Sequence, residues 1–345
     1  MNKFGKYHWI ALFVLIFVVF LGAVRATKPR VLVLYSYSKG NMVTQYLNSG
    51  INEALAINRV PVSVRQHYMG LDTGLTAEQA DREANESFGM VQTFAPDVLI
   101  IAGHQANKLL APRISELSPS IWVVPVSVEV GPEALGYKSA SNVVEVIRSL
   151  PITGIAEFMA DIGRRKPLNV SILGADTPGN ELRMKNLSQG VPGNMQVTSR
   201  FLSNCFDEWK NDIANLSNKT DVLLILPTVT LQERCSPESP TLTGNQFIPW
   251  VEANSRALPI GTEGTFVKNG GAVSFYPSYQ EEGSLAMDLA LLLIDHNRKA
   301  VPQRLYADSY QVALDVSRLR TRNISVPSIY VQYGQKSGLN YRDSD

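Results

Sequence analysis

The sequence has little cysteine and almost no net charge. Only two of its 345 residues are cysteines, which excludes a small domain framed by disulfides. Its 32 Lys and Arg residues nearly balance 31 Asp and Glu residues, so the whole chain offers no general attraction for nucleic acid. With 45% hydrophobic and 18% charged residues it is neither disordered nor collagen-like, and it is long enough for two domains.

Local catalytic motifs are also missing. The sequence contains no G-x-G-x-x-G, no Walker A motif, no G-x-S-x-G elbow and no H-E-x-x-H. Its four histidines are far apart and show no metal-ligand spacing: His8, His67, His104 and His296. No enzyme class, cofactor or metal is therefore indicated. A secreted α/β enzyme whose catalytic residues converge from distant loops is the lesser alternative.

The longest hydrophobic run is confined to the N-terminus. Lys3 and Lys6 precede an apolar run of 16 residues at positions 9–24, and Val24-Arg25-Ala26 offers a cleavage site after Ala26. This pattern predicts a cleavable signal peptide over residues 1–26. An uncleaved anchor is the alternative, although the run falls short of the roughly 18 residues usual for a spanning helix. Without this segment, 29 basic residues face 31 acidic ones, a formal charge of −2.

Export would place the mature chain in the periplasm or outside the cell. Such compartments are oxidising, so Cys205 and Cys235 can pair there, but they can equally remain free or buried thiols. Their separation of 30 residues does not decide between these states.

Beyond residue 30, short β-branched runs alternate with amphipathic stretches, which is typical of βα units around parallel sheets. The first series has predicted strands at 31–35, 62–68, 97–102 and 121–126, and helices at 42–56, 76–94 and 105–117. Thr76 and Gln79 have the spacing of a capping box. A second series has helices at 152–163, 181–187, 206–216, 247–256 and 279–295, and strands at 169–173, 197–201, 222–226 and 272–276. The pattern therefore predicts two α/β halves.

Ligands of open α/β sheets bind beyond the carboxyl ends of the strands. In this chain those positions carry hydroxyls, amides, carboxylates and aromatic rings, which suit a small polar ligand. Each Ser or Thr has an alternative role as a cap of the following helix, an explanation that is harder to apply to His104 and Glu129. The candidate ligand-binding residues are Ser36, Tyr37, Ser38, His104, Gln105, Ser127, Glu129, Asp176, Thr228, Glu263, Tyr276 and Tyr279.

Several segments carry a family resemblance. They are residues 31–38, residues 267–279, Glu282-Gly283 with the apolar helix that follows, residues 310–315 and Val326-Pro327. Together they resemble the substrate-binding proteins of ABC transporters, in the family with a type I periplasmic-binding fold that includes aromatic amino-acid binders. The chain departs from that family at Asp315, where Asn is usual, and at residues 129–132 and 142–145, where Thr-Gly or Asp-Pro dipeptides are often found. These departures leave the identity of the ligand open.

The resemblance implies two Rossmann-like lobes with parallel sheets, joined by three hinge crossovers near residues 146–151, 265–268 and 299–304. It places residues 27–147 with 268–300 in lobe 1 and residues 148–267 with 301–345 in lobe 2. The implied function is capture of a small polar ligand, an amino acid being one candidate, in the cleft between the lobes. The ligand would pass to an ABC permease, or the closed form would be read by a membrane sensor protein. No catalysis and no nucleic-acid partner are expected.

Overall fold

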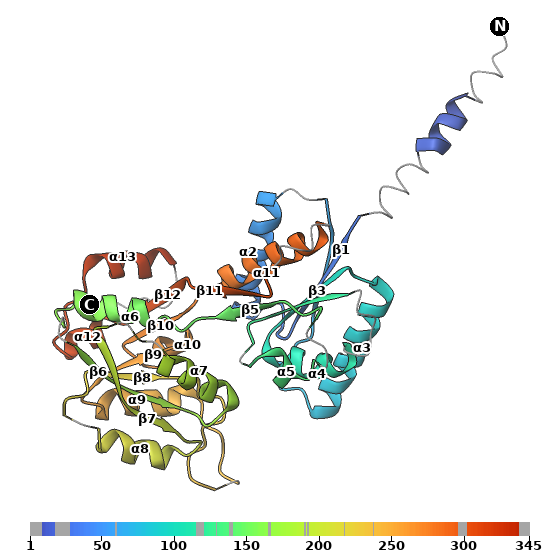
Figure 1. Ribbon diagram of the computed structural model, residues 1–345. Coiled ribbons are helices and arrows are strands. Elements are labelled where there is room, and N and C mark those ends of the chain that lie inside the picture. The colour runs from blue at the N-terminus through green and yellow to red at the C-terminus, as the bar shows by residue number, and fades with distance from the viewer. Residues whose placement is uncertain are drawn as a thin grey trace. The chain divides into compact units, whose positions relative to one another are not determined.

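The computed structural model describes residues 9–17, 28–58, 61–114, 121–128, 130–137, 141–164, 167–189, 191, 193–216, 218–236, 238–295 and 302–337 (Figure 1). Residues 9–17 of the predicted signal peptide are helical, and its cleavage site lies outside the described residues. Within the described ranges, no helix combines the length and the apolar character needed to cross a membrane.

The chain folds into two compact units. The first consists of Met1–Val128, Pro132–Val146 and Glu282–Leu305, and the second of Glu129–Gly131, Ile147–Glu281 and Tyr306–Asp345. The chain crosses from one unit to the other after Val146, Glu281 and Leu305. The short segment Glu129–Gly131, which is assigned to the second unit, adds one brief crossing and return. The crossings after Val146 and Leu305 fall in strands β5 and β11, which pair with each other: Glu145–Arg148 and Arg304–Ala307.

The predicted lobe boundaries need two corrections. Residues 268–281 belong to the second unit, not to the first, because strand β10 (Val273–Pro277) pairs with β9 (Leu258–Gly261) and with β12 (Tyr310–Leu314) in the sheet of that unit. Residues 301–305 belong to the first unit instead of the second.

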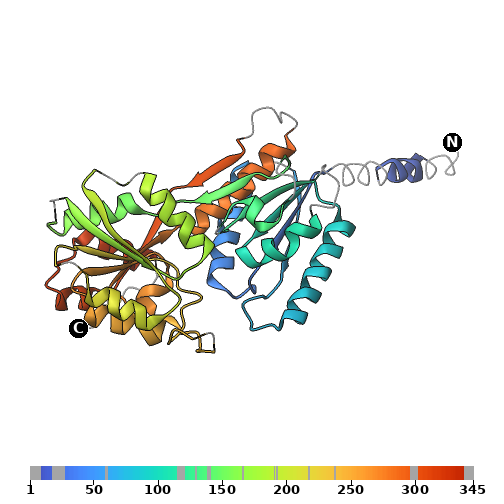
Figure 2. The ribbon, with the colours of Figure 1, turned by 60° about the horizontal axis from the view of Figure 1, so that its bottom comes forward.

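The first unit contains a four-stranded parallel sheet in the order β2-β1-β3-β4. The central strands β1 and β3 are buried almost throughout, as expected when helices cover both faces of a parallel sheet. Helices α2 and α11 lie on one side of this sheet and α3, α4 and α5 on the other (Figures 1 and 2). The bounds are β1 Arg30–Tyr35, α2 Met42–Asn58, β2 Ser63–Tyr68, α3 Ala77–Phe94, β3 Val98–Ala102, α4 His104–Ile114, β4 Trp122–Val126, α5 Pro132–Leu135 and α11 Tyr279–Ile294.

The predicted capping box at the start of α3 is confirmed. The Thr76 hydroxyl accepts a hydrogen bond from the Gln79 amide at 3.3 Å. In return, the Gln79 side-chain oxygen accepts one from the Thr76 amide at 2.8 Å. Two amides of the first helical turn thus have partners, which fixes where this helix begins.

The second unit contains a six-stranded sheet in the order β12-β10-β9-β8-β6-β7, in which only the pairing of β12 with β10 is antiparallel. Residues of β6, β8, β10 and β12 enter two different cores on the two faces of the sheet. One core packs against α6, α7 and α12, and the other against α8, α9 and α10. The remaining bounds are α6 Ile152–Asp161, β6 Leu168–Gly174, α7 Pro178–Gln189, β7 Met195–Leu202, α8 Phe206–Ala214, β8 Val222–Ile225, α9 Gly244–Asn254, α10 Thr265–Lys268, α12 Val316–Thr321 and α13 Ser328–Ser337.

The two cysteines form a disulfide, which decides between the two states that the sequence allowed. Cys205 is the N-cap residue of α8, and Cys235 lies in the connection between β8 and α9. The bond therefore ties this long connection to the beginning of a helix in the same unit.

Candidate functional site

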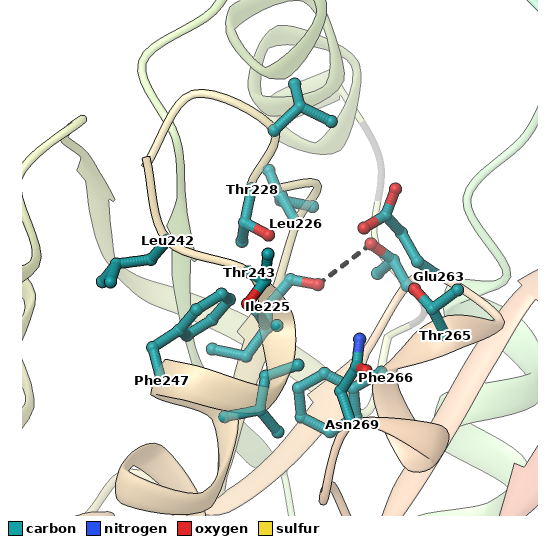
Figure 3. Close-up of a pocket in the computed structure, with 14 residues that line it drawn as sticks. Ile225, Leu226, Thr228, Leu242, Thr243, Phe247, Glu263, Thr265, Phe266 and Asn269 are labelled. Carbon is teal, nitrogen blue, oxygen red and sulfur yellow. Dashed lines mark hydrogen bonds between the residues drawn. The ribbon is translucent and has the colours of Figure 1, made fainter. Parts of the chain in front are cut away.

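A cavity of about 240 Å³ lies at the carboxyl ends of β8 and β9 in the second unit (Figure 3). This is the edge at which open α/β sheets bind their ligands. The size is below the usual 300–1,000 Å³ range of sites for drug-sized molecules, so it suits a smaller ligand or one part of a ligand. The lining residues are Ile225, Leu226, Thr228, Val229, Leu242, Thr243, Gly244, Phe247, Ile248, Thr262, Glu263, Thr265, Phe266 and Asn269.

Close backbone packing shapes this cavity. The Thr262 amide and hydroxyl both donate to the Ile225 carbonyl, at 3.0 and 2.9 Å, and so join the ends of the two strands. A Cβ at Gly261 would lie 2.2 Å from the Phe266 ring, and one at Gly244 would lie 2.3 Å from the Asn269 amide. Glycine at these two positions therefore allows α10 to pack close to the strand end and to the start of α9.

The lining combines an apolar floor with a few polar groups. Thr228 and Glu263 lie on opposite sides of the hollow in Figure 3. The Thr243 hydroxyl is engaged with Asn245 and Gln246 at the start of α9, at 2.5 and 2.7 Å. Glu263 is the only Asp, Glu, Lys, Arg or His among the lining residues. This chemistry fits hydrogen bonding to a small polar molecule with an apolar part.

Two of the predicted ligand-binding residues, Thr228 and Glu263, line the cavity, and both are half-buried. The other predicted residues of the second unit do not. Asp176 is exposed, and its backbone amide and carbonyl pair with the side chain of Asn204 at 3.0 Å each. The ring of Tyr279 packs under the Arg148 guanidinium at 5.0 Å.

Tyr276 requires a correction. Its side chain is only 2% exposed and belongs to the core that packs against α8, α9 and α10. Side chains alternate between the two faces of a strand, and the face that Tyr276 occupies is covered by helices. We therefore remove Tyr276 from the set of candidate ligand contacts.

Ser36 requires a correction of another kind. It is fully buried, and its hydroxyl accepts a hydrogen bond from the Ala106 amide at 3.3 Å, in the first turn of α4. Gly103 allows this close approach, since a Cβ there would lie 2.5 Å from the Ser36 Cβ. The capping alternative is thus correct for Ser36, although the helix that it caps is not the next one in the chain.

Ser127 is also engaged within the fold. Its backbone has a φ of 55°, a left-handed conformation that is uncommon for a residue with a side chain. The hydroxyl donates to the carboxylate of Glu282, which is 1% exposed. This hydrogen bond connects the end of β4 to α11 and gives the buried carboxylate a partner. The structure therefore gives Ser127 a structural role.

The loop after β1 is organised around Asp72. Its carboxylate accepts hydrogen bonds from the Ser38 amide at 2.6 Å, the Ser38 hydroxyl at 3.0 Å and the Asn41 side chain at 2.9 Å. Partial burial disfavours the charged form of Asp72, but these hydrogen bonds outweigh it, so the pKa of the carboxyl is lowered. The hydroxyl of Ser38, a predicted ligand contact, is thereby used to hold the loop.

Three predicted residues of the first unit remain candidates by position. Tyr37 follows β1, and His104 and Gln105 begin α4 directly after β3. Tyr37 and His104 are half-buried and Gln105 is exposed. Glu129 lies outside the described residues.

Sequence reasoning missed the cavity residues that helices contribute. Phe247 lies in the first turns of α9, and Thr265, Phe266 and Asn269 belong to α10 or its end. Helix α10 has only four residues, too few for a helical hydrophobic period to show. The one available signal was the position of these residues just after a strand end.

Comparison with known proteins gives the class of fold. No protein-family model matches the sequence, and no curated protein matches it. Solved structures do match. The ligand-free, open form of a substrate-binding protein with adhesive properties from Clostridium difficile has a TM-score of 0.60 and 13% identity, over 92% of this chain and 100% of that one.

Two further structures show the same likeness. An ABC domain in complex with L-Trp from Streptococcus pneumoniae has a TM-score of 0.52 and 13% identity, over 88% of this chain and 98% of that one. An arabinose-binding protein from Geobacillus stearothermophilus has a TM-score of 0.52 and 12% identity, over 87% of this chain and 100% of that one. At such identities the likeness shows the fold. The resemblance to the type I periplasmic-binding fold is confirmed at that level.

Proposed function

We propose that this chain is an exported solute-binding protein that captures a small polar ligand and delivers it to an ABC transporter. The observation that carries the proposal is the cavity beyond β8 and β9, where Thr228 and Glu263 meet an apolar floor. The likeness in fold to a substrate-binding protein and to an arabinose-binding protein supports it. The predicted signal peptide over residues 1–26 would place the mature chain outside the cytoplasm.

The proposed mechanism is binding without a chemical step. Thr228 and Glu263 of the second unit and Tyr37, His104 and Gln105 of the first would contact the same ligand. A ligand that contacts both units favours whichever arrangement allows both sets of contacts, and the gain in contact energy sets the shift in population. A permease or a membrane sensor would then recognise that arrangement; the same binding step serves either partner.

A thermal-shift screen tests the proposal. The full mature chain is heated alone and with amino acids, pentoses and hexoses, nucleosides and dipeptides. A compound that binds only the folded protein raises its melting temperature, and at 100 times its Kd it adds about 2.7 kcal/mol of stability. We expect at least one class to give a saturable shift. If the protein instead converts a compound that it binds into a product, the mechanism of binding without chemistry is wrong.

Replacing Thr228 by valine removes one hydroxyl from the cavity and keeps the shape of the side chain. We expect the affinity for a compound found in the screen to fall about fivefold, the equivalent of one hydrogen bond of about 1 kcal/mol. The melting temperature of the free protein should stay within about 1 °C, because this hydroxyl belongs to the cavity wall. Isothermal titration calorimetry measures the first quantity and a melting curve the second.

Two variants serve as controls for Thr228→Val. Thr93→Val makes the same change on helix α3 of the first unit, where the hydroxyl bonds only to the Gly89 carbonyl, and should leave the affinity unchanged. Ser36→Ala leaves the buried Ala106 amide without its partner, so it should lower the stability by about 1–2 kcal/mol. Equal affinities of the wild type and Thr228→Val would remove Thr228 from the site.

A further inference from the structure

Most of the connection between β8 and α9, residues 227–243 (the 227–243 loop), forms one wall of the cavity. Its first residues, Thr228 and Val229, and its last, Leu242 and Thr243, all line the cavity. Figure 3 shows Thr228, Leu242 and Thr243 on the side of the hollow opposite Glu263. Residues 230–236 and 238–241, the described middle of the loop, are not among the lining residues, so we consider their effect on binding through the positions of the two ends.

The middle of the loop is attached to the connection between β7 and α8 through Asn204. The side-chain oxygen of Asn204 accepts a hydrogen bond from the Thr230 hydroxyl at 2.6 Å, and its backbone carbonyl accepts one from the Gln232 amide at 2.8 Å. The Gln232 carbonyl in turn accepts from the Phe206 amide at 2.9 Å. The Asn204 side chain is itself fixed by its two hydrogen bonds with the backbone of Asp176.

The disulfide provides a covalent attachment at the same place. Cys205 directly follows Asn204 and bonds to Cys235, three residues beyond Gln232. From this attachment, hydrogen bonds lead to both ends of the loop. The Leu231 amide donates to the Thr228 carbonyl at 3.0 Å, and the Leu242 amide donates to the Leu231 carbonyl at 2.7 Å. Leu231 is fully buried in the core that packs against α8, α9 and α10, so its side chain fixes the middle of the loop to that core.

We propose that the Cys205–Cys235 disulfide and Asn204 are positioning groups for the cavity, so that its affinity for a ligand depends on the oxidation state of the two cysteines. The statement about affinity rests on the proposed ligand-binding function. In the oxidised chain the 227–243 loop keeps Thr228 and Leu242 at the cavity wall. In the reduced chain only non-covalent contacts retain the loop, namely the hydrogen bonds to Asn204 and Phe206 and the burial of Leu231, and the wall becomes mobile.

The chemistry is a thiol–disulfide exchange with a dithiol. Cys205 is 6% exposed whereas Cys235 is exposed, so a thiolate of the reductant would attack the Cys235 sulfur. The Cys205 sulfur leaves as a thiolate and takes up a proton. The second thiol of the reductant then displaces Cys235, which also takes up a proton, while the reductant forms its own disulfide. Two electrons pass to the protein, and the ligand itself is unchanged.

Hydrogen exchange tests the positioning role without any ligand. The full mature chain is compared in the oxidised form, after treatment with dithiothreitol, and as the double variant Cys205→Ser with Cys235→Ser. The amides of Leu231, Gln232 and Leu242 should exchange about tenfold faster or more in the reduced and double-variant chains and should exchange well before the amides of β8, whose protection falls only as far as the stability of the whole unit falls. Dithiothreitol should have no effect on the double variant. Unchanged exchange in the loop would overturn the proposal.

Two further variants separate positioning from general loss of stability. Asn204→Ala leaves the disulfide intact and keeps the backbone carbonyl that accepts from the Gln232 amide. It removes the side-chain hydrogen bonds to Thr230 and Asp176, so the loop is held less firmly and the Gln232 amide should exchange faster in the oxidised chain. Phe158→Leu weakens the other core of the same unit, which packs against α6, and should leave exchange in the 227–243 loop unchanged. If Phe158→Leu accelerates exchange in the loop as much as the double variant does, the disulfide has no specific positioning role.

The ligand screen is repeated on the oxidised chain, the reduced chain and the double variant. This tests whether the affinity depends on the oxidation state of the two cysteines. A compound that binds the oxidised chain should bind the other two at least about tenfold more weakly, the equivalent of about 1.4 kcal/mol. Equal affinity for all three would overturn the redox dependence while leaving the solute-binding function intact. Binding of no compound by any form would contradict the proposed function, and the exchange data would still decide the positioning role.

Discussion

A Gly283→Ala variant is expected to lose about 3 kcal/mol or more of the stability of the first unit. Gly283 lies where α11 crosses the backbone of α2, and a Cβ at this position would lie 2.0 Å from the Leu47 carbonyl oxygen and 3.0 Å from the Leu47 Cα. The obstructing atoms belong to the backbone, so no side-chain rotation relieves the clash, and the two helices would have to separate. Urea unfolding followed by circular dichroism measures the loss.

Gly89→Ala is the matched control, because it makes the same change in a helix of the same unit. A Cβ at Gly89 in α3 would meet no atom within 4 Å. Alanine has the higher helix propensity, so this variant should be more stable than the wild type by about 0.5–1 kcal/mol. A Gly283→Ala variant as stable as Gly89→Ala would show that α2 and α11 do not approach each other as described.

The double variant Cys205→Ser with Cys235→Ser should lose about 3–4 kcal/mol of stability. The bond closes a loop between residues 30 positions apart, and its removal restores conformational freedom to the unfolded chain. The loss should appear in the unfolding of the second unit, and the wild type treated with dithiothreitol should lose as much. A loss below about 1 kcal/mol in both samples would indicate that the oxidised bond adds little to the folded state.

Much of the fold follows from short local patterns. The buried strands β3 and β8 are continuous apolar runs, and Thr76 with Gln79 marks the start of α3. The elements of the described residues for which no bounds were predicted are the strands β5, β9, β11 and β12 and the helices α5, α10, α12 and α13. Strands β5 and β11 have four residues each and pair only with each other, so their existence depends on a contact between distant parts of the chain.

In the candidate site, too, local sequence patterns pointed to some of the lining residues, whereas contacts between distant parts of the chain could not be predicted. The rule that ligands bind at strand ends led to Thr228 and Glu263, which line the cavity. It could not tell that the Ser36 hydroxyl caps α4, because this hydrogen bond joins residues 70 positions apart. Nor could it show that the face of β10 that carries Tyr276 is covered by helices. Which face of a strand is covered depends on the arrangement of the whole unit.

The most direct test of the central claim is calorimetric titration of one compound from the screen into three proteins: the wild type, Thr228→Val and Gln105→Ala. Thr228 lies in the second unit and the exposed Gln105 in the first, so the two variants examine the units separately. The account predicts that each variant binds the compound about fivefold more weakly than the wild type, with unchanged melting temperatures. Wild-type affinity in either variant would contradict it.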